Sequence, residues 1–292
     1  VTAGNQRRFM QNQYCLLTNL EATTVPKPFV KWAAEPAIAS EAPAVLAHAI
    51  HLATTPPMGP VFVSLPMDDL PVELTDTQAS DVAVVANRTV TRASGFPPEL
   101  AQQICQRIQS AASPVLVVGG DVERYDARDS VVALAERNHL PVWTAPLTGW
   151  SGFPENHPLY QGMLPPGAGW ISQILKGHDL VVVIGAPVFR YYPMIPGPYL
   201  PEGTSLVHIT NDPDEAARAP MGDAIIADLV SAARALADAS TPTQRPAPAP
   251  RPQAPAVQPA STPLAPANLW SAVAKAAPPN ALWVSEAGSN ET

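Results

Sequence analysis

The middle of the chain alternates short apolar runs with amphipathic stretches. Apolar runs bounded by turn residues predict strands at 115–118, 142–144, 180–184, 206–209 and 225–226. The stretches between and around them predict helices, beginning at Pro97-Pro98, around 130–137 and at 229–236. Since the strands are almost continuously apolar and alternate with helices, we expect a parallel sheet covered on both faces. Residues 97–240 are therefore predicted to form a doubly wound, Rossmann-like α/β domain.

The flanking segments carry weaker signals of the same α/β kind. Residues 1–4 resemble the end of a strand running into a turn, 42–53 a helix, and 60–66 a buried strand between prolines. We expect 1–73 to be part of a further α/β domain. The polar, aperiodic residues 74–96 are expected to be a connector.

Beyond residue 240, a high proline content predicts a segment without helices or strands. The chain has 36 prolines, more than twice the usual share of about 5%, and many lie within 241–266. This composition favours an extended, semi-rigid spacer over a PxxP-type ligand. A helix at 265–276 and a strand at Leu282 should follow, so 267–292 is interpreted as the start of a third domain.

Charge and cysteine content exclude several classes of protein. The net charge is −8 and only 14% of residues are charged, which argues against nucleic-acid binding and against a polybasic membrane-surface protein. No apolar run approaches the ~20 residues that span a bilayer. Two cysteines cannot build a disulfide scaffold, so we expect a reducing, cytoplasmic location.

Candidate chemistry is sparse when motifs alone are considered. Gly119-Gly120 and Gly185 follow predicted strands, where a nucleotide-binding turn would lie, but neither fits G-x-G-x-x-G, and Asp121 adds negative charge. We favour tight turns without a ligand. Asp212 follows another strand and could bind a ribose hydroxyl, although Asn-Asp-Pro is also an ordinary helix start.

No metal site or reactive cysteine is predicted from spacing. His48 and His51 lie at i, i+3 of a predicted helix, but a metal would need a third ligand. Cys15 and Cys105 have no CxxC context and are expected to be inert.

Longer strings carry a family resemblance over nearly the whole chain, apart from 74–96 and the proline-rich segment. They are VTAG at 1–4, LLTN at 16–19, FVKW at 29–32, GPV at 59–61, Asp68-Asp69, GHD at 177–179, VIGAPVFRY at 183–191 and EAARAPMGDAI at 215–225. With these strings the chain resembles the thiamine-diphosphate-dependent decarboxylases, and among them the benzoylformate decarboxylases.

The resemblance implies three α/β domains and a chain that is a piece of a longer one. Residues 1–73 then correspond to the back half of the pyrimidine-binding domain, 97–240 to the central domain, and 267–292 to the start of the diphosphate-binding domain. The implied cofactors are thiamine diphosphate and Mg²⁺. The family's cofactor-activating glutamate and first active-site histidine would precede Val1, and its metal motif would follow Thr292, so we expect this piece alone to be inactive.

The resemblance also implies the reaction and the residues near it. The family converts a 2-keto acid to an aldehyde and CO₂, usually as a homo-oligomer, here expected to be a dimer or tetramer. Glu286, Gly288 and Ser289 correspond to a loop lining the cofactor cleft. Tyr192 stands where benzoylformate decarboxylases have a catalytic histidine; a phenol, with a pKa near 10, shuttles protons less well at neutral pH than imidazole near 6.5.

Two alternatives remain open from the sequence. Loss of that histidine could favour a carboligase of the acetolactate synthase or benzaldehyde lyase kind. A non-catalytic nucleotide-binding module is the third hypothesis, because the central domain is Rossmann-like. The sequence leaves open the native substrate, the choice between decarboxylase and carboligase, and the oligomeric state.

Overall fold

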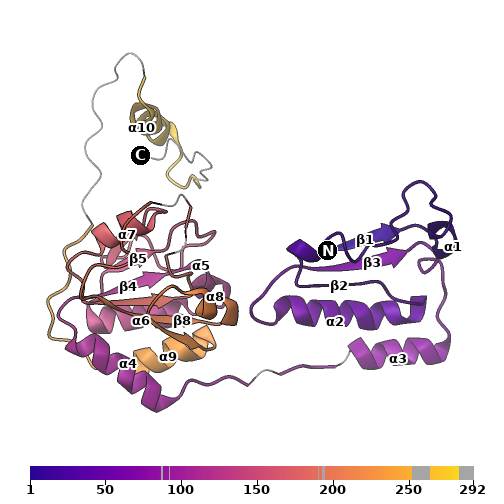
Figure 1. The fold of residues 1–292 in the computed structure, drawn as a ribbon, viewed down its shortest axis with the longest axis horizontal. Coiled ribbons are helices and arrows are strands. Elements are labelled where there is room, and N and C mark those ends of the chain that lie inside the picture. Colours follow the sequence, from indigo (N-terminus) through magenta and orange to yellow (C-terminus); the bar gives the residue numbers. More distant parts are fainter. Residues whose placement is uncertain (87, 92, 190, 193–194, 252–263, 283–292) are drawn as a thin grey trace. The chain divides into compact units, whose positions relative to one another are not determined.

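A computed structural model describes residues 1–86, 88–91, 93–189, 191–192, 195–251 and 264–282. The chain divides into two compact units, Val1–Ala249 and Pro250–Thr292. The first unit contains two parallel sheets, one of three strands and one of six (Figure 1). In the described part of the chain, no helix is long and apolar enough to cross a membrane.

The six-stranded sheet confirms the predicted doubly wound fold. Its strands are β4 (Pro114–Val118), β5 (Val142–Thr144), β6 (Tyr160–Met163), β7 (Leu180–Ile184), β8 (Ser205–Thr210) and β9 (Asp223–Ile226). They lie in the order β6-β5-β4-β7-β8-β9, and every neighbouring pair is parallel. From β4 the chain adds strands in one direction, then returns to add β7, β8 and β9 in the other.

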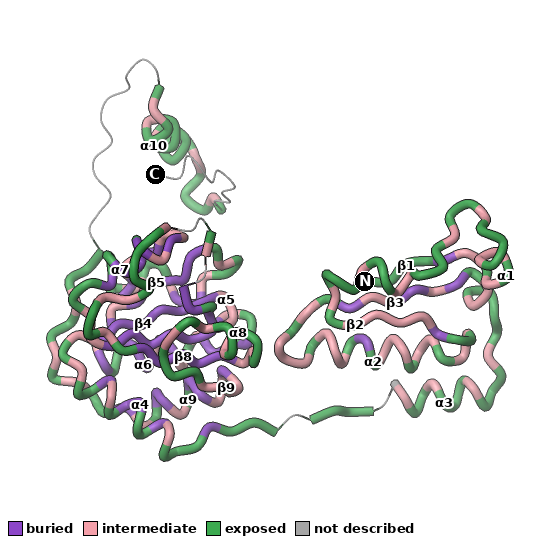
Figure 2. Tube along the Cα trace, viewed as in Figure 1, coloured by how far each residue is buried: buried purple, intermediate pink, exposed green. Residues whose placement is uncertain are grey.

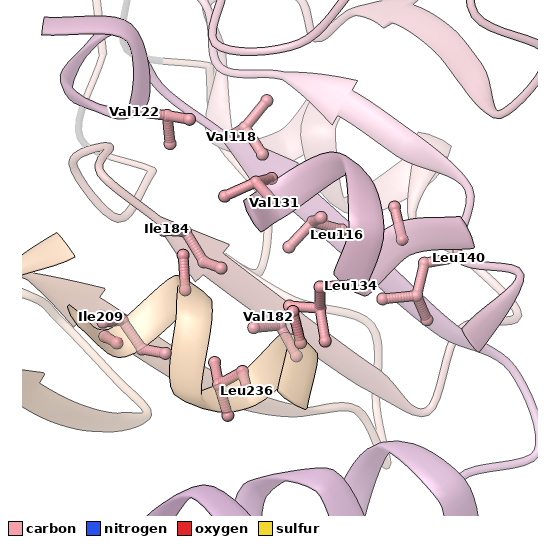
Figure 3. Packing of buried hydrophobic residues seen from close by; sticks show 14 of the residues in the cluster. Leu116, Val118, Val122, Val131, Leu134, Leu140, Val182, Ile184, Ile209 and Leu236 are labelled. Atoms are coloured by element: carbon pink, nitrogen blue, oxygen red, sulfur yellow. The ribbon is translucent and has the colours of Figure 1, made fainter. Parts of the chain in front are cut away.

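Alternate residues of the central strands serve two different cores. Leu116 and Val182 pack against one face with α4 (Pro98–Ser110), α6 (Arg128–Asn138) and α9 (Leu229–Ala239) (Figure 3). Val115 and Val181 point to the other face, where α7 (Ala168–Ile174) contributes Ile171. Because both faces are covered, β4 and β7 are buried along their whole length, as the buried colour of β4 shows in Figure 2. This accounts for the unbroken apolar runs in their sequences.

The N-terminal sheet is smaller and has its own core. It consists of β1 (Thr2–Asn5), β3 (Val61–Pro66) and β2 (Trp32–Ala34), in that order and all parallel. Helix α2 (Ala42–Thr54) packs on one face through Ala49 against Val61 and Val63. The predicted helix at 42–53 and strand at 60–66 are thus confirmed.

Several short elements complete the described chain. They are α1 (Arg8–Gln11), η1 (Lys27–Phe29), η2 (Ala39–Glu41), α3 (Asp76–Ala86), α5 (Gly120–Arg124), α8 (Pro213–Arg218) and α10 (Pro266–Ala276). The last of these confirms the helix expected at 265–276.

Three expectations need correction or qualification. Residues 74–96 contain the helix α3, which contacts α2, so this segment is not merely an irregular connector. The first residues of the predicted spacer, 241–249, belong to the first compact unit. Leu282 is 90% exposed and outside any strand, and the rest of the strand predicted there falls outside the described residues. The other domain boundaries stay a prediction.

Candidate functional site at the carboxyl edge of the central sheet

The strand order creates a topological switch point between β4 and β7. The chain leaves β4 toward β5 and leaves β7 toward β8, so the two connections depart in opposite directions. In open α/β sheets, ligands bind in the crevice outside the carboxyl ends of the strands at such a point. The candidate site therefore lies beyond Val118 and Ile184, the last residues of β4 and β7.

A cleft of about 380 Å³ lies at this edge. It is lined by residues that follow β4, β5 and β7: Gly119, Gly120, Asp121, Arg124, Ala145, Pro146, Leu147, Thr148, Gly149, Gly185, Ala186, Pro187 and Tyr191. Leu147 and Phe189 lie in the loops after β5 and β7 and have φ values of 56° and 48°. Non-glycine residues in the left-handed region are uncommon and cluster at functional sites.

The glycines join the two central strands and do not form a phosphate cradle. The amide of Gly119 donates to the Ile184 carbonyl at 3.0 Å, and the amide of Asp121 donates to the Gly185 carbonyl at 3.3 Å. A Cβ on Gly119 would lie 2.1 Å from the Gly185 oxygen, and Gly185 itself has φ of 64°. Close approach between the two backbones explains these glycines, which confirms the tight-turn interpretation.

The electrostatics of the cleft disfavour a bound phosphate. Burial raises the pKa of Asp121, Arg124 opposes that rise, and the charges of Asp212 and Glu215 add to it. The Arg124 guanidinium lies 3.6 Å from Asp121 and also stacks over the Trp150 ring, 5.7 Å from its centroid. Among the described residues that line the cleft, Arg124 is the one cation, and it is already engaged with a carboxylate and an indole.

Asp212 and His208 have structural roles beside this edge. The Asp212 carboxylate accepts the Asp214 and Glu215 amides at 2.8 and 3.2 Å, which caps the start of α8. This confirms the helix start that Asn-Asp-Pro predicted. His208 is fully buried, and its Nε2 lies 2.9 Å from the Ala186 carbonyl. Since a carbonyl can only accept, Nε2 donates and fixes the loop after β7.

Tyr191 and Tyr192 occupy the same loop but differ in environment. The Tyr191 hydroxyl donates to the Pro187 carbonyl at 3.0 Å, and its ring lines the cleft. Tyr192 is 84% exposed, so it is not part of the packed core.

The remaining candidate residues from the sequence have different outcomes. Glu286, Gly288 and Ser289 lie outside the described residues. Among the residues that are described, no three His, Cys, Asp or Glu side chains gather into a metal site. His48 stacks near Trp32, with ring centroids 4.9 Å apart, which supports the packing interpretation of His48.

The sequence interpretation missed a polar cluster at the carboxyl edge of the smaller sheet. Glu35 Oε2 accepts from the Asn5 side-chain amide at 3.0 Å and from the Ser64 hydroxyl at 2.5 Å. Asn5 ends β1, Glu35 follows β2, and Ser64 lies in β3. Each is a polar residue at or just after an apolar strand, and that position was the available signal.

Comparison with known proteins gives the family context. Residues 101–236 match the family described as "Thiamine pyrophosphate enzyme, central domain". A benzoylformate decarboxylase of Pseudomonas aeruginosa is 40% identical over 292 residues, which is 100% of this chain and 54% of that protein. An acetolactate synthase large subunit of Corynebacterium glutamicum is 33% identical over 181 residues, 60% of this chain and 28% of that one.

Solved structures agree in both sequence and fold. A thiamine diphosphate-dependent 4-hydroxybenzoylformate decarboxylase of Rhodococcus jostii matches with a TM-score of 0.87 and 39% identity, covering 97% of this chain and 53% of that one. A benzoylformate decarboxylase of Polynucleobacter necessarius matches with a TM-score of 0.85 and 36% identity, covering 96% and 52%. This chain thus spans about half the length of these relatives.

Proposed function

Because this chain belongs to the thiamine-pyrophosphate-dependent enzymes, we propose that the whole protein is a 2-keto acid decarboxylase of the benzoylformate type. One observation carries the proposal. The similarity to benzoylformate decarboxylase runs through both sheets and the C-terminal unit, whereas the acetolactate synthase similarity covers only part of the chain. The substrate class that follows is a small 2-keto acid, with CO₂ and an aldehyde as products.

The described residues do not themselves fit thiamine diphosphate and Mg²⁺. A diphosphate bound through Mg²⁺ needs carboxylate and carbonyl ligands for the metal, and the described residues offer no acidic or histidine cluster of three. At the central cleft, the raised pKa of Asp121 reflects burial next to further acidic groups, an environment that disfavours a phosphate. We propose that the cofactor is held elsewhere, with Glu286, Gly288 and Ser289 as contributors.

Within this chain, we assign a role in the reaction to the loop after β7. Tyr192 is our candidate for a side chain that faces the substrate. It is supported by its position in the loop that follows Ile184 at the switch point, by its exposure of 84%, and by the resemblance that places a histidine there. A phenol near neutral pH is protonated and can donate a hydrogen bond, but it accepts protons poorly.

That exchange of imidazole for phenol is also what favours the second candidate, a carboligase. With thiamine diphosphate bound, a weaker proton donor at position 192 would deliver the proton for aldehyde release more slowly, and that would favour reaction with a second carbonyl compound. The nucleotide-binding module is disfavoured, because Gly119 and Gly185 are used for strand contacts and Arg124 is engaged by Asp121.

The test uses the intact protein supplied with thiamine diphosphate and Mg²⁺. Benzoylformate is added, and CO₂ and benzaldehyde are measured together. Equal amounts of the two support the decarboxylase. CO₂ accompanied by a hydroxyketone in place of free aldehyde supports the carboligase, and no CO₂ from benzoylformate or any aliphatic 2-keto acid contradicts both.

We further propose a cytoplasmic homo-oligomer, a dimer or tetramer. Free Cys15 and Cys105 are compatible with a reducing compartment. Sedimentation of the intact protein measures its assembly state, and a monomer at micromolar concentration would contradict this part of the proposal.

A further inference from the structure

Residues 241–249, here called the strap, do not leave the central domain when α9 ends. The Thr241 hydroxyl accepts from the Gln109 side chain at 2.6 Å, and the Thr243 amide donates to the Arg137 carbonyl at 2.9 Å. At the far end, the Gln161 side chain in β6 donates to the Ala249 carbonyl at 3.1 Å. The strap is therefore hydrogen-bonded to the central domain at both of its ends.

Arg245 is the centre of this contact. Its Nη1 donates to the Asn138 carbonyl at 2.9 Å, and its Nη2 donates to the Ile108 and Ala111 carbonyls, both at 3.0 Å. These carbonyls belong to the last turns of α4 and α6, where each helix leaves acceptors without intrahelical partners. One guanidinium thus caps two helices at once.

The charge of Arg245 suits that position. A cation is favoured at a helix C-terminus, and here two helix ends converge on it. Burial lowers the pKa of Arg245, while the nearby Asp179 carboxylate raises it. Asp179 in turn accepts the Ala112 and Ser113 amides at 2.7 and 2.8 Å. The α4–β4 turn therefore offers carbonyls to a cation and amides to an anion.

His139 holds the backbone of the same residue. It terminates α6 in the left-handed conformation, with φ of 49°, and its Nδ1 lies 2.5 Å from the Arg245 carbonyl. Since the carbonyl accepts, Nδ1 donates. The ends of α4 and α6 thus hold the side chain of Arg245. His139, which follows α6, holds its backbone carbonyl.

We propose that the central domain carries a recognition surface for an Arg-Pro-x-Pro segment, and that its occupant is the chain's own strap. The surface comprises the C-terminal ends of α4 and α6 together with Gln161. Proline-rich segments suit such sites because little conformational entropy is lost on binding. The inference is independent of the catalytic function proposed above.

The consequence concerns the C-terminal unit. With the strap bound, the tether to α10 consists of residues 250–265 rather than 241–265. At about 3.6 Å per residue, its greatest reach falls from about 90 Å to about 58 Å. The strap thus fixes where the tether starts and limits its greatest reach.

The experiment compares the full chain with its Arg245→Gln and Arg245→Lys variants by hydrogen exchange and by proteinase K digestion. In Arg245→Gln, the Thr243 amide should exchange about tenfold faster or more, since charged hydrogen bonds are lost, and cleavage within 241–249 should appear. Arg245→Lys keeps the charge without the planar fork and should be intermediate. Arg234→Gln, an exposed position on α9, is the matched control and should behave as the parent.

A peptide of the sequence TPTQRPAPA tests recognition directly. Labelled peptide should bind the Arg245→Gln chain, whose surface is vacated, more tightly than the parent chain, whose surface is occupied, and the same peptide with glutamine for arginine should not bind. Unchanged exchange of Thr243 in Arg245→Gln would overturn the proposal. So would equal loss of protection in β7, because Arg245 would then support the whole domain and not the strap.

Discussion

Arg8 and Asp69 form a bidentate ion pair at the carboxyl edge of the smaller sheet. Nη1 donates to Oδ1 at 2.7 Å and Nη2 donates to Oδ2 at 2.8 Å, while Nη2 also reaches the Pro36 carbonyl at 2.8 Å. The Asp69 side chain is only 7% exposed. Its hydrogen bond raises the pKa of Arg8. The pair ties the segments that follow β1, β2 and β3 to one another.

Replacing Asp69 with asparagine should destabilise the N-terminal sheet. The change keeps the size of the side chain but leaves a partly buried guanidinium without its anion, so the free energy of unfolding should fall by about 1–3 kcal/mol. Urea denaturation followed by the indole NMR signal of Trp32, which is resolved from those of the other tryptophans, measures this. Asp81→Asn, on the exposed side of α3, is the control, and an equal effect of the two would contradict a specific role for the pair.

Gly119→Ala should destabilise the central domain. The added Cβ would lie 2.1 Å from the Gly185 oxygen, so β4 and β7 must separate at their carboxyl ends, at a cost of about 1–3 kcal/mol. Gly149 lines the same cleft, and a Cβ added there would meet no atom within 4 Å. The effect of Gly149→Ala on the free energy of unfolding should therefore stay within about 0.5 kcal/mol. Equal melting temperatures for both variants would be inconsistent with the close approach described.

Asp179 should contribute a pH-dependent part of the stability. Burial raises its pKa, but the amides of Ser113 and Ala112 and the charge of Arg245 outweigh burial and lower it overall. A carboxyl whose pKa is lower in the folded state stabilises the fold at pH values above its ordinary pKa of 3.8. This contribution is lost as the pH falls through the lowered pKa of the folded state. Denaturation at several pH values should show that Asp179→Asn is less stable than the parent at pH 7 and that the gap narrows below pH of about 4. A constant gap would contradict the assignment.

Thiamine diphosphate and Mg²⁺ should not stabilise the 292-residue chain when it is studied alone. A ligand at 100 times its Kd would add about 2.7 kcal/mol, and the described residues hold no site for the pair. Differential scanning calorimetry measures the shift in melting temperature, first with each component separately and then with both. An upward shift that needs both components together would show that this chain binds the cofactor.

Tyr192→His should change proton handling in the intact enzyme. If the side chain faces the substrate, imidazole restores a general acid whose pKa lies near neutrality, and the rate with benzoylformate should rise about tenfold or more. A new inflection near pH 6.5 should accompany the gain. Tyr199→His, at another exposed tyrosine, controls for adding a histidine, and a Tyr192→His profile identical to the parent's would remove Tyr192 from the reaction.

The apolar pattern was sufficient to predict five of the six strands of the central sheet. β5 and β7 coincide with the predicted strands, because strands buried on both faces must be apolar throughout. β6 escaped prediction because it lies at the edge of the sheet and its sequence, YQGM, includes a polar residue and a glycine. Helix α3, which contacts α2, was missed because its composition is only weakly apolar.

Contacts that depend on distant residues had no local signal. The attachment of Arg245 requires the ends of α4 and α6, more than a hundred residues earlier, so composition alone indicated a free spacer. The glycines after β4 and β7 were correctly interpreted as turns, because the missing third glycine was visible in the sequence. The role of Tyr192 and of the 286–289 loop rests on resemblance, since no pattern within the chain specifies it.

The position of β4 in its sheet has a consequence for synthesis. It is the first strand of the domain to be made, yet Val115 pairs with Val181, about 66 residues later, which a ribosome adds in roughly 3–13 s. During that interval one edge of an entirely apolar strand has no partner. Because β5 pairs with the opposite edge of β4, it leaves this edge open until β7 is made. Slowing translation between β5 and β7 should therefore increase aggregation.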